Sequence, residues 1–321
     1  MAQTRIINHL GKWFFWPVGV WLVCARTVTA DTDGGSFGHA VIRGAAGGSE
    51  IVITTTPRLA GAIHSLTWGG KEFIDSTDHG RQLQSASNFD AGLAPISAET
   101  YNPTEAGSVD DGAGPTSSSR LLHMLSGPNY LQSTTQMAFW LPPGGSSSGQ
   151  PARNHRVLSN HLLTKRVYIG QSRLPHAISY DVTFSLPIGE KHTEAVFEAL
   201  TGYMPAEFSE FLYYDKTTGH CVPLSDGPGE QSAPVVLSVP GGSHAMGIFV
   251  PAPSGSNLIG PRYGRFRLDT AKVVKWNCVF RQTAPDGVLP SDYTFRMLVL
   301  VGNLEMVRSA MTQLHANGGV P

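Results

Sequence analysis

The chain has 321 residues, and its 23 Lys and Arg residues nearly balance 24 Asp and Glu residues, giving a formal net charge of −1 at pH 7. This balance argues against the basic surfaces that bind nucleic acid or anionic membranes. With 36 Gly, 22 Pro and only 15% charged residues, the composition predicts many tight turns and short strands, and therefore an all-β fold.

The first 30 residues read as a secretory signal. Arg5 and Lys12 supply positive charge, Trp13–Ala25 is an apolar run, and the small residue Ala30 ends a cleavage-site pattern. A membrane anchor is the alternative, but the run is shorter than the roughly 20 apolar residues that span a bilayer, and it contains Pro17. We therefore expect a secreted or periplasmic protein with no membrane contact after cleavage.

The sequence after the signal predicts one domain. Residues 31–48 are glycine-rich and read as a flexible linker, and residues 49–321 as a single β-sandwich domain. Of the three cysteines, only Cys221 and Cys278 lie beyond the signal. They are either disulfide-bonded, as an oxidising compartment allows, or unpaired and buried. Their spacing does not match a zinc site.

The first strong strand patterns form a hairpin. Ile51–Thr56 is a strand that Pro57 stops, Gly61–Trp68 alternates polar with apolar residues, and the Gly69-Gly70 turn leads back into Lys71–Asp75. A polar segment, residues 75–105, follows directly. Residues 85–130 lose all periodicity and are expected to form a long loop, and residues 142–153 (PPGGSSSGQPAR) a surface excursion.

The clearest strands lie in the middle of the chain. Ile178, Tyr180, Val182, Phe184 and Leu186 share one predicted face. In the next strand, residues 193–204, one face is expected to carry Glu194, Val196, Glu198 and Leu200.

The pattern after residue 204 ends in one helix. Residues 205–214 read as a short helix followed by a strand, or as an aromatic-lined rim, and strands are predicted at 235–239, 245–250, 273–282 and 293–301. Asn303 is a suitable N-cap for a final helix that Gly318 would end. The fold class is therefore all-β, a large antiparallel β-sandwich with one C-terminal α-helix.

The sharpest local motif is His79-Gly80-Arg81-Gln82-Leu83-Gln84. In an extended segment His79 and Arg81 project to the same side. An arginine fork grips a carboxylate or two hydroxyls, and a histidine moves protons near neutral pH. We predict a catalytic His79 with Arg81 and Gln84 binding substrate. The alternative is that Arg81 pairs with Asp75 or Asp78 to fix the loop, while His79 caps a turn.

A second polar group, Tyr101-Asn102-Pro103-Thr104-Glu105, reads as a turn that presents an aromatic ring, an amide and a carboxylate. Aromatic faces stack on sugar rings and amides bind hydroxyls, although an exposed Asn-Pro turn is an equal alternative. Tyr101 and Glu105 are predicted to be catalytic. The predicted substrate-binding residues outside the first motif are Asn88, Asn102, Tyr213 and Tyr214.

Two further carboxylates, Glu198 and Glu207, lie near aromatic residues. They are either solvated charges or members of a cleft in which a raised pKa would make one of them a general acid. Asp75, Asp78, Asp110 and Asp111 offer oxygen atoms for calcium but match no calcium-loop pattern. We therefore predict no cofactor and no metal, with bound calcium as the alternative. Glycine elbows of serine hydrolases, phosphate-binding loops and His-Glu-x-x-His motifs are missing from the sequence.

The predicted signal, the long β-rich chain and the motif around His79, Arg81 and Gln84 together resemble the galactose-mutarotase-like supersandwich. This group contains aldose epimerases, several glycoside hydrolases and the β-sandwich domains of polysaccharide lyases. The resemblance implies a concave sugar-binding face lined by an arginine, histidines and a carboxylate, and it is most specific at Asp78–Gln84. The C-terminal glutamate motif of the epimerases has no clear counterpart, which favours a hydrolase or a lyase.

We therefore predict a secreted carbohydrate-active enzyme that cleaves glycosidic bonds. A hydrolase would pair Glu105 with Glu198 or Glu207. A lyase would use Arg81 to neutralise a uronate carboxylate, and His79 or Tyr101 to move protons. The alternatives are a non-catalytic carbohydrate-binding or cell-surface module, and a sugar isomerase like the aldose epimerases.

Overall fold

The structure, a computed structural model, describes residues 37–171, 173–251 and 258–321. It confirms the all-β prediction, with one antiparallel sheet of 19 strands and a separate two-stranded hairpin. α1 (Leu304–Ala316) is the single α-helix in these ranges. The expected signal lies outside them and stays a prediction, as does the assignment of the rest of the chain to a single domain. Within the described ranges, no helix is long and apolar enough to cross a bilayer.

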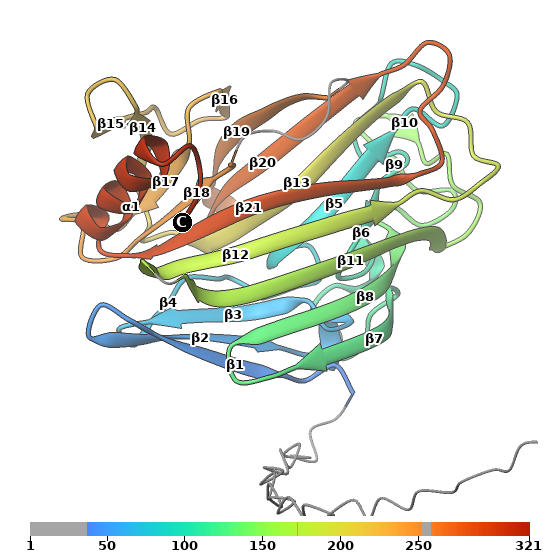
Figure 1. Ribbon diagram of the computed structural model, residues 1–321. Coiled ribbons are helices and arrows are strands. Elements are labelled where there is room, and N and C mark those ends of the chain that lie inside the picture. The colour runs from blue at the N-terminus through green and yellow to red at the C-terminus, as the bar shows by residue number, and fades with distance from the viewer. Residues whose placement is uncertain (1–36, 172, 252–257) are drawn as a thin grey trace, which may run out of the picture. The chain divides into compact units, whose positions relative to one another are not determined.

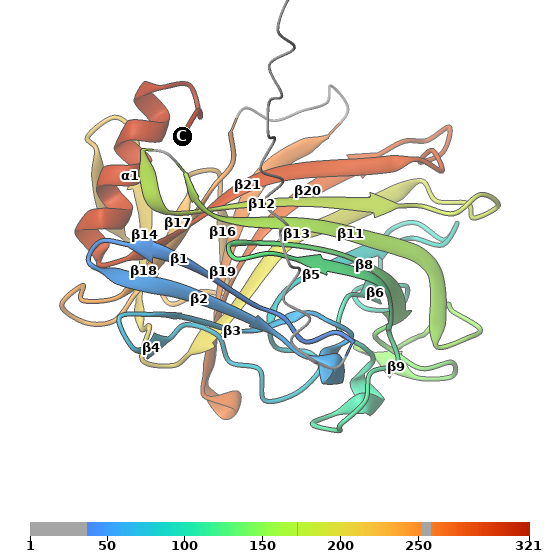
Figure 2. The same ribbon diagram turned by 60° about the horizontal axis from the view of Figure 1, so that its bottom comes forward.

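The sheet folds into two layers, which Figures 1 and 2 show from two directions. The first layer contains, in hydrogen-bonded order, β7 (Arg120–Ser126), β8 (Tyr130–Phe139), β11 (Leu158–Gln171), β12 (Leu174–Ser185), β21 (Asp292–Gly302), β18 (Ala245–Phe249), β17 (Val235–Ser238), β14 (Glu210–Asp215) and β15 (His220–Pro223). The second contains β1 (Val41–Ala46), β2 (Ser49–Thr55), β3 (Ile63–Trp68), β5 (Leu83–Phe89), β13 (Glu194–Pro205), β20 (Val273–Thr283), β19 (Ile259–Leu268) and β16 (Gly229–Gln231).

Short elements complete the sandwich. β4 (Lys71–Glu72) forms the predicted hairpin with β3, and the short strand β6 (Pro103–Thr104) pairs with both β5 and β8, so it joins the two layers. β9 (Ser146–Ser147) and β10 (Gln150–Pro151) form the separate hairpin inside the predicted excursion. Single 3₁₀ turns occupy Pro57–Leu59, Val109–Asp111 and Asp269–Ala271.

The main core lies between the layers. The predicted inward face of β12 is confirmed, because Ile178, Tyr180, Val182, Phe184 and Leu186 are all buried. α1 packs on the opposite face of β21 and β18, where Val307, Met311 and Leu314 are buried against Leu298 and Leu300. Asn303 caps the helix as predicted, since its Oδ1 accepts a hydrogen bond from the Met306 amide at 2.8 Å.

Three predictions about local structure are wrong. The expected linker contains β1, whose pairing with β2 outweighs its glycine content. The expected loop at residues 85–130 contains β6, β7 and most of β5. The strands β5 (LQSASNF) and β6 (PT) have too few apolar residues to show an alternation, and the apolar residues of β7 (RLLHMLS) do not alternate with polar ones. Pro205 ends β13, so the alternative of a helix starting there is not observed.

The prediction that Leu200 shares a strand face with Glu198 is also wrong. The register of β13 with β20 shifts between Glu198 and Leu200. This β-bulge reverses the alternation, so Leu200 enters the core and is fully buried. Glu198, Thr201 and Tyr203 consequently share the outer face of the second layer.

Cys221 and Cys278, the two cysteines in the described part of the chain, are free thiols. Cys278 on β20 is fully buried, and Cys221 on β15 is half-buried. Burial raises the pKa of Cys278 well above its ordinary value and that of Cys221 to about 11. The alternative of unpaired cysteines is the one observed.

Candidate functional site

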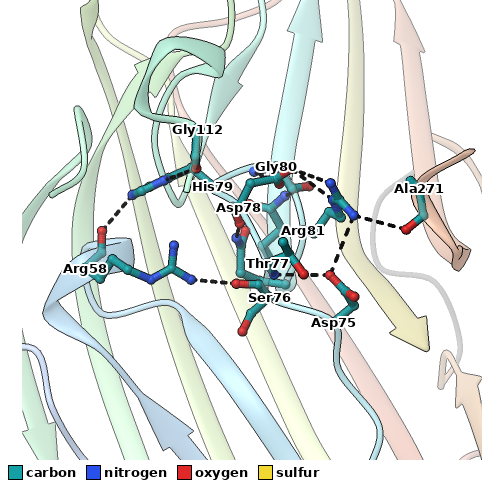
Figure 3. A network of polar contacts seen from close by, with 12 residues as sticks. Arg58, Asp75, Ser76, Thr77, Asp78, His79, Gly80, Arg81, Gly112 and Ala271 are labelled. Carbon is teal, nitrogen blue, oxygen red and sulfur yellow. Dashed lines mark hydrogen bonds and ion pairs between the residues drawn. The ribbon is translucent and has the colours of Figure 1, made fainter. Parts of the chain in front are cut away.

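The turn at residues 78–81 connects β4 with β5 through polar contacts that Figure 3 shows at close range. His79 is 1% exposed. Its Nδ1 lies 2.7 Å from the Gly112 carbonyl oxygen and its Nε2 lies 2.8 Å from that of Arg58. The imidazole therefore ties together three chain segments, and neither ring nitrogen faces a hollow.

Arg81 also forms hydrogen bonds and ion pairs with neighbouring residues. Its Nε and Nη2 donate to Asp78 Oδ2 at 3.0 and 2.7 Å, and its Nη1 donates to the Ala271 carbonyl at 3.4 Å. Asp75 lies 3.9 Å from Nη1. The guanidinium fork is thus occupied by the loop itself, which is the structural alternative that the sequence left open.

We expect His79→Ala to act on stability. Removing the ring takes the donor from the Arg58 carbonyl, which costs about 1–3 kcal/mol, whereas the Gly112 carbonyl still accepts from the His79 backbone amide at 2.9 Å. Urea unfolding should therefore show a loss of roughly 1–3 kcal/mol. The exposed His123 on β7 is the control, because its replacement by alanine should change stability by no more than about 0.5 kcal/mol. A variant of unchanged stability that had lost glycan turnover would restore a catalytic role for His79.

A polar cleft lies on the outer face of the second layer, with a volume of about 330 Å³. Register brings its lining together in two rows across the strands: Gln84, Thr201 and Asn277 are cross-strand partners, and so are Tyr203, Lys275 and Phe266. The lining residues are Gly80, Gln84, Ala86, Asn88, Ala98, Glu99, Asn102, Thr104, Trp140, Glu198, Thr201, Tyr203, Phe266, Lys275 and Asn277. It combines three aromatic rings with four amides and one ion pair.

Glu198 and Lys275 form that ion pair, with 3.3 Å between Oε2 and Nζ. Glu198 Oε2 also accepts from Thr201 Oγ1 at 2.8 Å and from Asn277 Nδ2 at 3.4 Å. Burial pushes the pKa of Glu198 upward, but the Lys275 charge and these hydrogen bonds outweigh it and hold the pKa below its usual value. Glu198 is therefore ionised at neutral pH. This argues against the general-acid role considered from the sequence and suits a base or nucleophile.

Lys275 is held between two rings. Its Nζ lies 5.1 Å from the centroid of Tyr203 and 5.3 Å from that of Phe266, within cation–π range. Burial lowers its pKa, but Glu198 and Tyr203 more than compensate, so the pKa lies above the ordinary value. The floor of the cleft is thus a fixed pair of opposite charges.

Glu99 supplies a second carboxylate at the rim. Its backbone has a φ of 66°, a value that residues other than glycine rarely adopt. Its amide donates to Asn88 Oδ1 at 3.2 Å, and its Oε2 accepts from Ser147 Oγ at 2.6 Å, so the β9 hairpin fixes its position. Backbone strain of this kind gathers at functional sites.

The predicted site residues fall into two groups. Gln84, Asn88, Asn102 and Glu198 line the cleft. The remaining residues do not line it: His79, Arg81, Glu105, Glu207, Tyr101, Tyr213 and Tyr214. Sequence spacing could not reveal this, because β13 and β20 reach β5 only in the folded sheet.

The residues outside the cleft have identifiable contacts. Glu105 is fully buried and pairs with the equally buried Lys165. Glu207 forms a surface pair with Lys71 at 2.5 Å. Tyr214 is buried on β14, where its hydroxyl lies 3.0 Å from Thr312 Oγ1, and Tyr213 lies on the same strand. The proposed carboxylate pairs of Glu105 with Glu198 or Glu207 are therefore not brought together in the cleft.

The sequence reasoning missed Glu99, Trp140, Tyr203, Phe266, Lys275 and Asn277. Lys275 and Asn277 interrupt the apolar strand VVKWNCVF at every second position, and this spacing indicates a polar outer face. Trp140 gave no periodic signal. Its ring occupies the space beside Gly80, where an added Cβ would lie 2.7 Å from it.

A larger hollow of about 800 Å³ lies at the start of α1. Glu305 and Arg308 in its lining pair with each other, and its described lining residues include no Trp, Tyr or Phe. It offers less for recognition of an organic ligand than the smaller cleft.

No protein-family model matches the chain, and no curated protein matches its sequence. Solved structures with a similar fold include the Slr1438 protein from Synechocystis, with 9% identity and a TM-score of 0.43 over 82% of this chain and 96% of that one. A glycosyl hydrolase family 38 protein from Enterococcus faecalis has 12% identity and a TM-score of 0.49 over 84% of this chain and 31% of its own. The heparan sulfate lyase HepC from Pedobacter heparinus has 10% identity and a TM-score of 0.41 over 83% and 35%.

Proposed function

We propose that the cleft binds a saccharide and that the protein is a carbohydrate-active enzyme that hydrolyses a glycosidic bond. The observation that carries the proposal is the composition of the cleft on β5, β13 and β20. Amides from Gln84, Asn88 and Asn277 can bind hydroxyl groups, and the Trp140 ring offers an apolar face for a sugar ring. Export, which the first 30 residues predict, is part of the same proposal.

Hydrolysis is favoured over elimination by the charges at hand. A hydrolase requires two carboxylates beside the bond, and Glu198 and Glu99 both line the cleft. In the proposed reaction Glu198, which is ionised, acts as nucleophile or base, and Glu99 is the second carboxyl group. A lyase requires a donor that neutralises a uronate carboxylate, but Arg81 is bound to Asp78 and Lys275 to Glu198.

A non-catalytic binding module is the second candidate, and one observation favours it. Glu198 Oε2 already has three partners, in Lys275, Thr201 and Asn277. In a binding module this carboxylate would hold the side chains that contact the ligand and would take no part in a reaction.

The test is a screen of the purified protein against poly- and oligosaccharides, including uronate polymers. New reducing ends without near-ultraviolet absorbance are expected, whereas an absorbing product would indicate a lyase. Trp140→Ala should raise KM about tenfold, because a stacked aromatic ring contributes on the order of 1 kcal/mol or more. The matched control is Tyr168→Ala, an exposed ring on β11, which should have no effect.

Three outcomes separate the candidates. Binding without cleavage, weakened by Trp140→Ala, would favour the binding module. Interconversion of sugar anomers without cleavage would indicate an isomerase. A folded protein that neither binds nor cleaves any glycan would overturn the assignment of the cleft.

A further inference from the structure

A second cluster of titratable side chains has no member in the lining of the cleft. It consists of His161 on β11 and of Glu190 and His192 in the connection between β12 and β13. One ligand atom from each of these three residues lies within 4.8 Å of the other two. His161 and His192 have side chains 2% and 4% exposed, and Glu190 is 20% exposed. No sequence motif marks this cluster, because 28 residues separate His161 from Glu190.

The two imidazoles converge on one oxygen atom. His161 Nε2 lies 2.8 Å and His192 Nε2 lies 3.0 Å from Glu190 Oε2. Four atoms bound tetrahedrally at about 2.0 Å from Zn²⁺ are about 3.3 Å apart. The two measured separations are therefore within about half an ångström of those in a zinc site.

Hydrogen bonds alone do not satisfy both ring nitrogens of a neutral His192, because its second ring nitrogen, Nδ1, is buried. His192 Nδ1 is buried without a hydrogen-bond partner among the described residues, and it lies 3.8 Å from Asp90 Oδ1. A neutral imidazole has one N–H and one lone pair. Whichever nitrogen carries the proton, the lone pair of the other faces a carboxylate.

A metal ion removes this conflict. The Nε2 lone pair would bind the cation together with Glu190, and Nδ1–H would point toward Asp90, an arrangement typical of metal-bound histidines. Asp90 is itself fixed by Thr193, whose amide and hydroxyl both donate to it.

The surroundings suit a first coordination shell with one open position. Phe89 packs against both imidazoles, with ring centroids 5.0 Å from His161 and 4.6 Å from His192. A cavity of about 160 Å³, lined by Glu190 and Tyr101 among others, adjoins the cluster. Arg153 and Arg156 also line it, but Arg153 Nη1 is bound to the carbonyls of Asp90 and Leu93.

We propose that His161, Glu190 and His192 form a binding site for a divalent transition-metal ion, with Zn²⁺ as the best fit. Two imidazoles and one carboxylate are borderline ligands that suit Zn²⁺ better than Mg²⁺ or Ca²⁺, which prefer oxygen atoms alone. The fourth position is open to water or to Tyr101 from the adjoining cavity. This assignment departs from the prediction of no metal and is independent of the saccharide proposal.

The test is calorimetric titration of tag-free, chelator-treated protein with Zn²⁺, and separately with Ca²⁺. One Zn²⁺ per chain and a rise in the melting temperature that chelator reverses are expected, with no response to Ca²⁺. His161→Ala and His192→Ala should each abolish the binding. His123→Ala, an exposed histidine on β7, should leave it unchanged.

A spectroscopic measurement on the unmodified protein covers the case in which the variants do not fold. X-ray absorption of the zinc-loaded chain should show two imidazole ligands and only nitrogen or oxygen neighbours at about 2.0–2.2 Å. Three results would overturn the proposal: no Zn²⁺ binding by the wild-type protein, full binding by folded His161→Ala and His192→Ala variants, or sulfur in the zinc shell. If the wild-type protein bound no Zn²⁺, a buried and charged imidazolium would explain the contacts of His192 with the two carboxylates.

Discussion

Replacing Glu198 with glutamine is expected to lower the kcat for glycan cleavage by about 10²–10⁴-fold, the usual contribution of a general base or acid. Glutamine has the same shape and can still accept the hydrogen bond of Thr201, so binding should change little. The loss should therefore appear in kcat while KM stays nearly constant. Steady-state kinetics on the glycan found by the screen would measure both.

The matched control for this variant is Glu207→Gln. Glu207 also pairs with a lysine, Lys71, but its side chain is 51% exposed and lies outside the cleft. Its variant should retain full turnover. Wild-type kcat in a folded Glu198→Gln protein would rule out a role for this carboxylate in the reaction. Parallel circular dichroism and melting curves would show whether Lys275, left without its partner, disturbs the fold.

The largest effect on stability is expected for Lys165→Met. Lys165 and Glu105 form an ion pair in which each side chain is 1% exposed. Glu105 also accepts a hydrogen bond from the Ser85 amide at 3.1 Å, and Lys165 Nζ donates to the Gly61 carbonyl at 3.3 Å. Removing the ammonium group leaves a buried carboxylate without a counter-charge, which should cost about 3–5 kcal/mol. Urea or thermal unfolding would measure the loss.

Two further variants test whether the loss of stability comes from the uncompensated charge of Glu105. Adding Glu105→Gln to Lys165→Met removes the uncompensated charge, so the double variant should be more stable than Lys165→Met alone. Lys71→Met breaks the exposed pair with Glu207 and should cost no more than about 1 kcal/mol. A Lys165→Met protein as stable as the wild type would show that Glu105 becomes protonated at no cost.

Glu198 and Glu105 have different surroundings in the fold, although their sequence contexts are similar. Both are glutamates close to strands, and both were predicted to be catalytic. Glu198 lies on the outer face of β13 beside Lys275, where Oε1 has no hydrogen-bond partner within the described part of the chain. Glu105 follows β6 and points between the layers. Which way a carboxylate points depends on pairing partners that lie far away in the sequence.

Only part of the motif at residues 78–84 lies in the cleft. It was recognised as important, and Gly80 and Gln84 do line the cleft. His79 and Arg81, which looked most reactive, instead bind Arg58, Gly112, Asp78 and Ala271. Titratable side chains with many possible partners give the same sequence signal whether they hold a loop or contact a ligand.

Local sequence patterns were enough to predict the all-β class, the inward face of β12, the β3–β4 hairpin and the capped helix α1. These features follow from local periodicity, turn residues and capping, which act over a few neighbouring residues. The folded sheet was needed to show that the bulge in β13 brings Glu198, Thr201 and Tyr203 to one face, and that β20 adds Lys275 and Asn277 beside them. Only the fold, likewise, brought His161 to Glu190 and His192. Cross-strand register joins residues nearly 80 positions apart, as between Glu198 and Asn277, and no local pattern encodes such pairing.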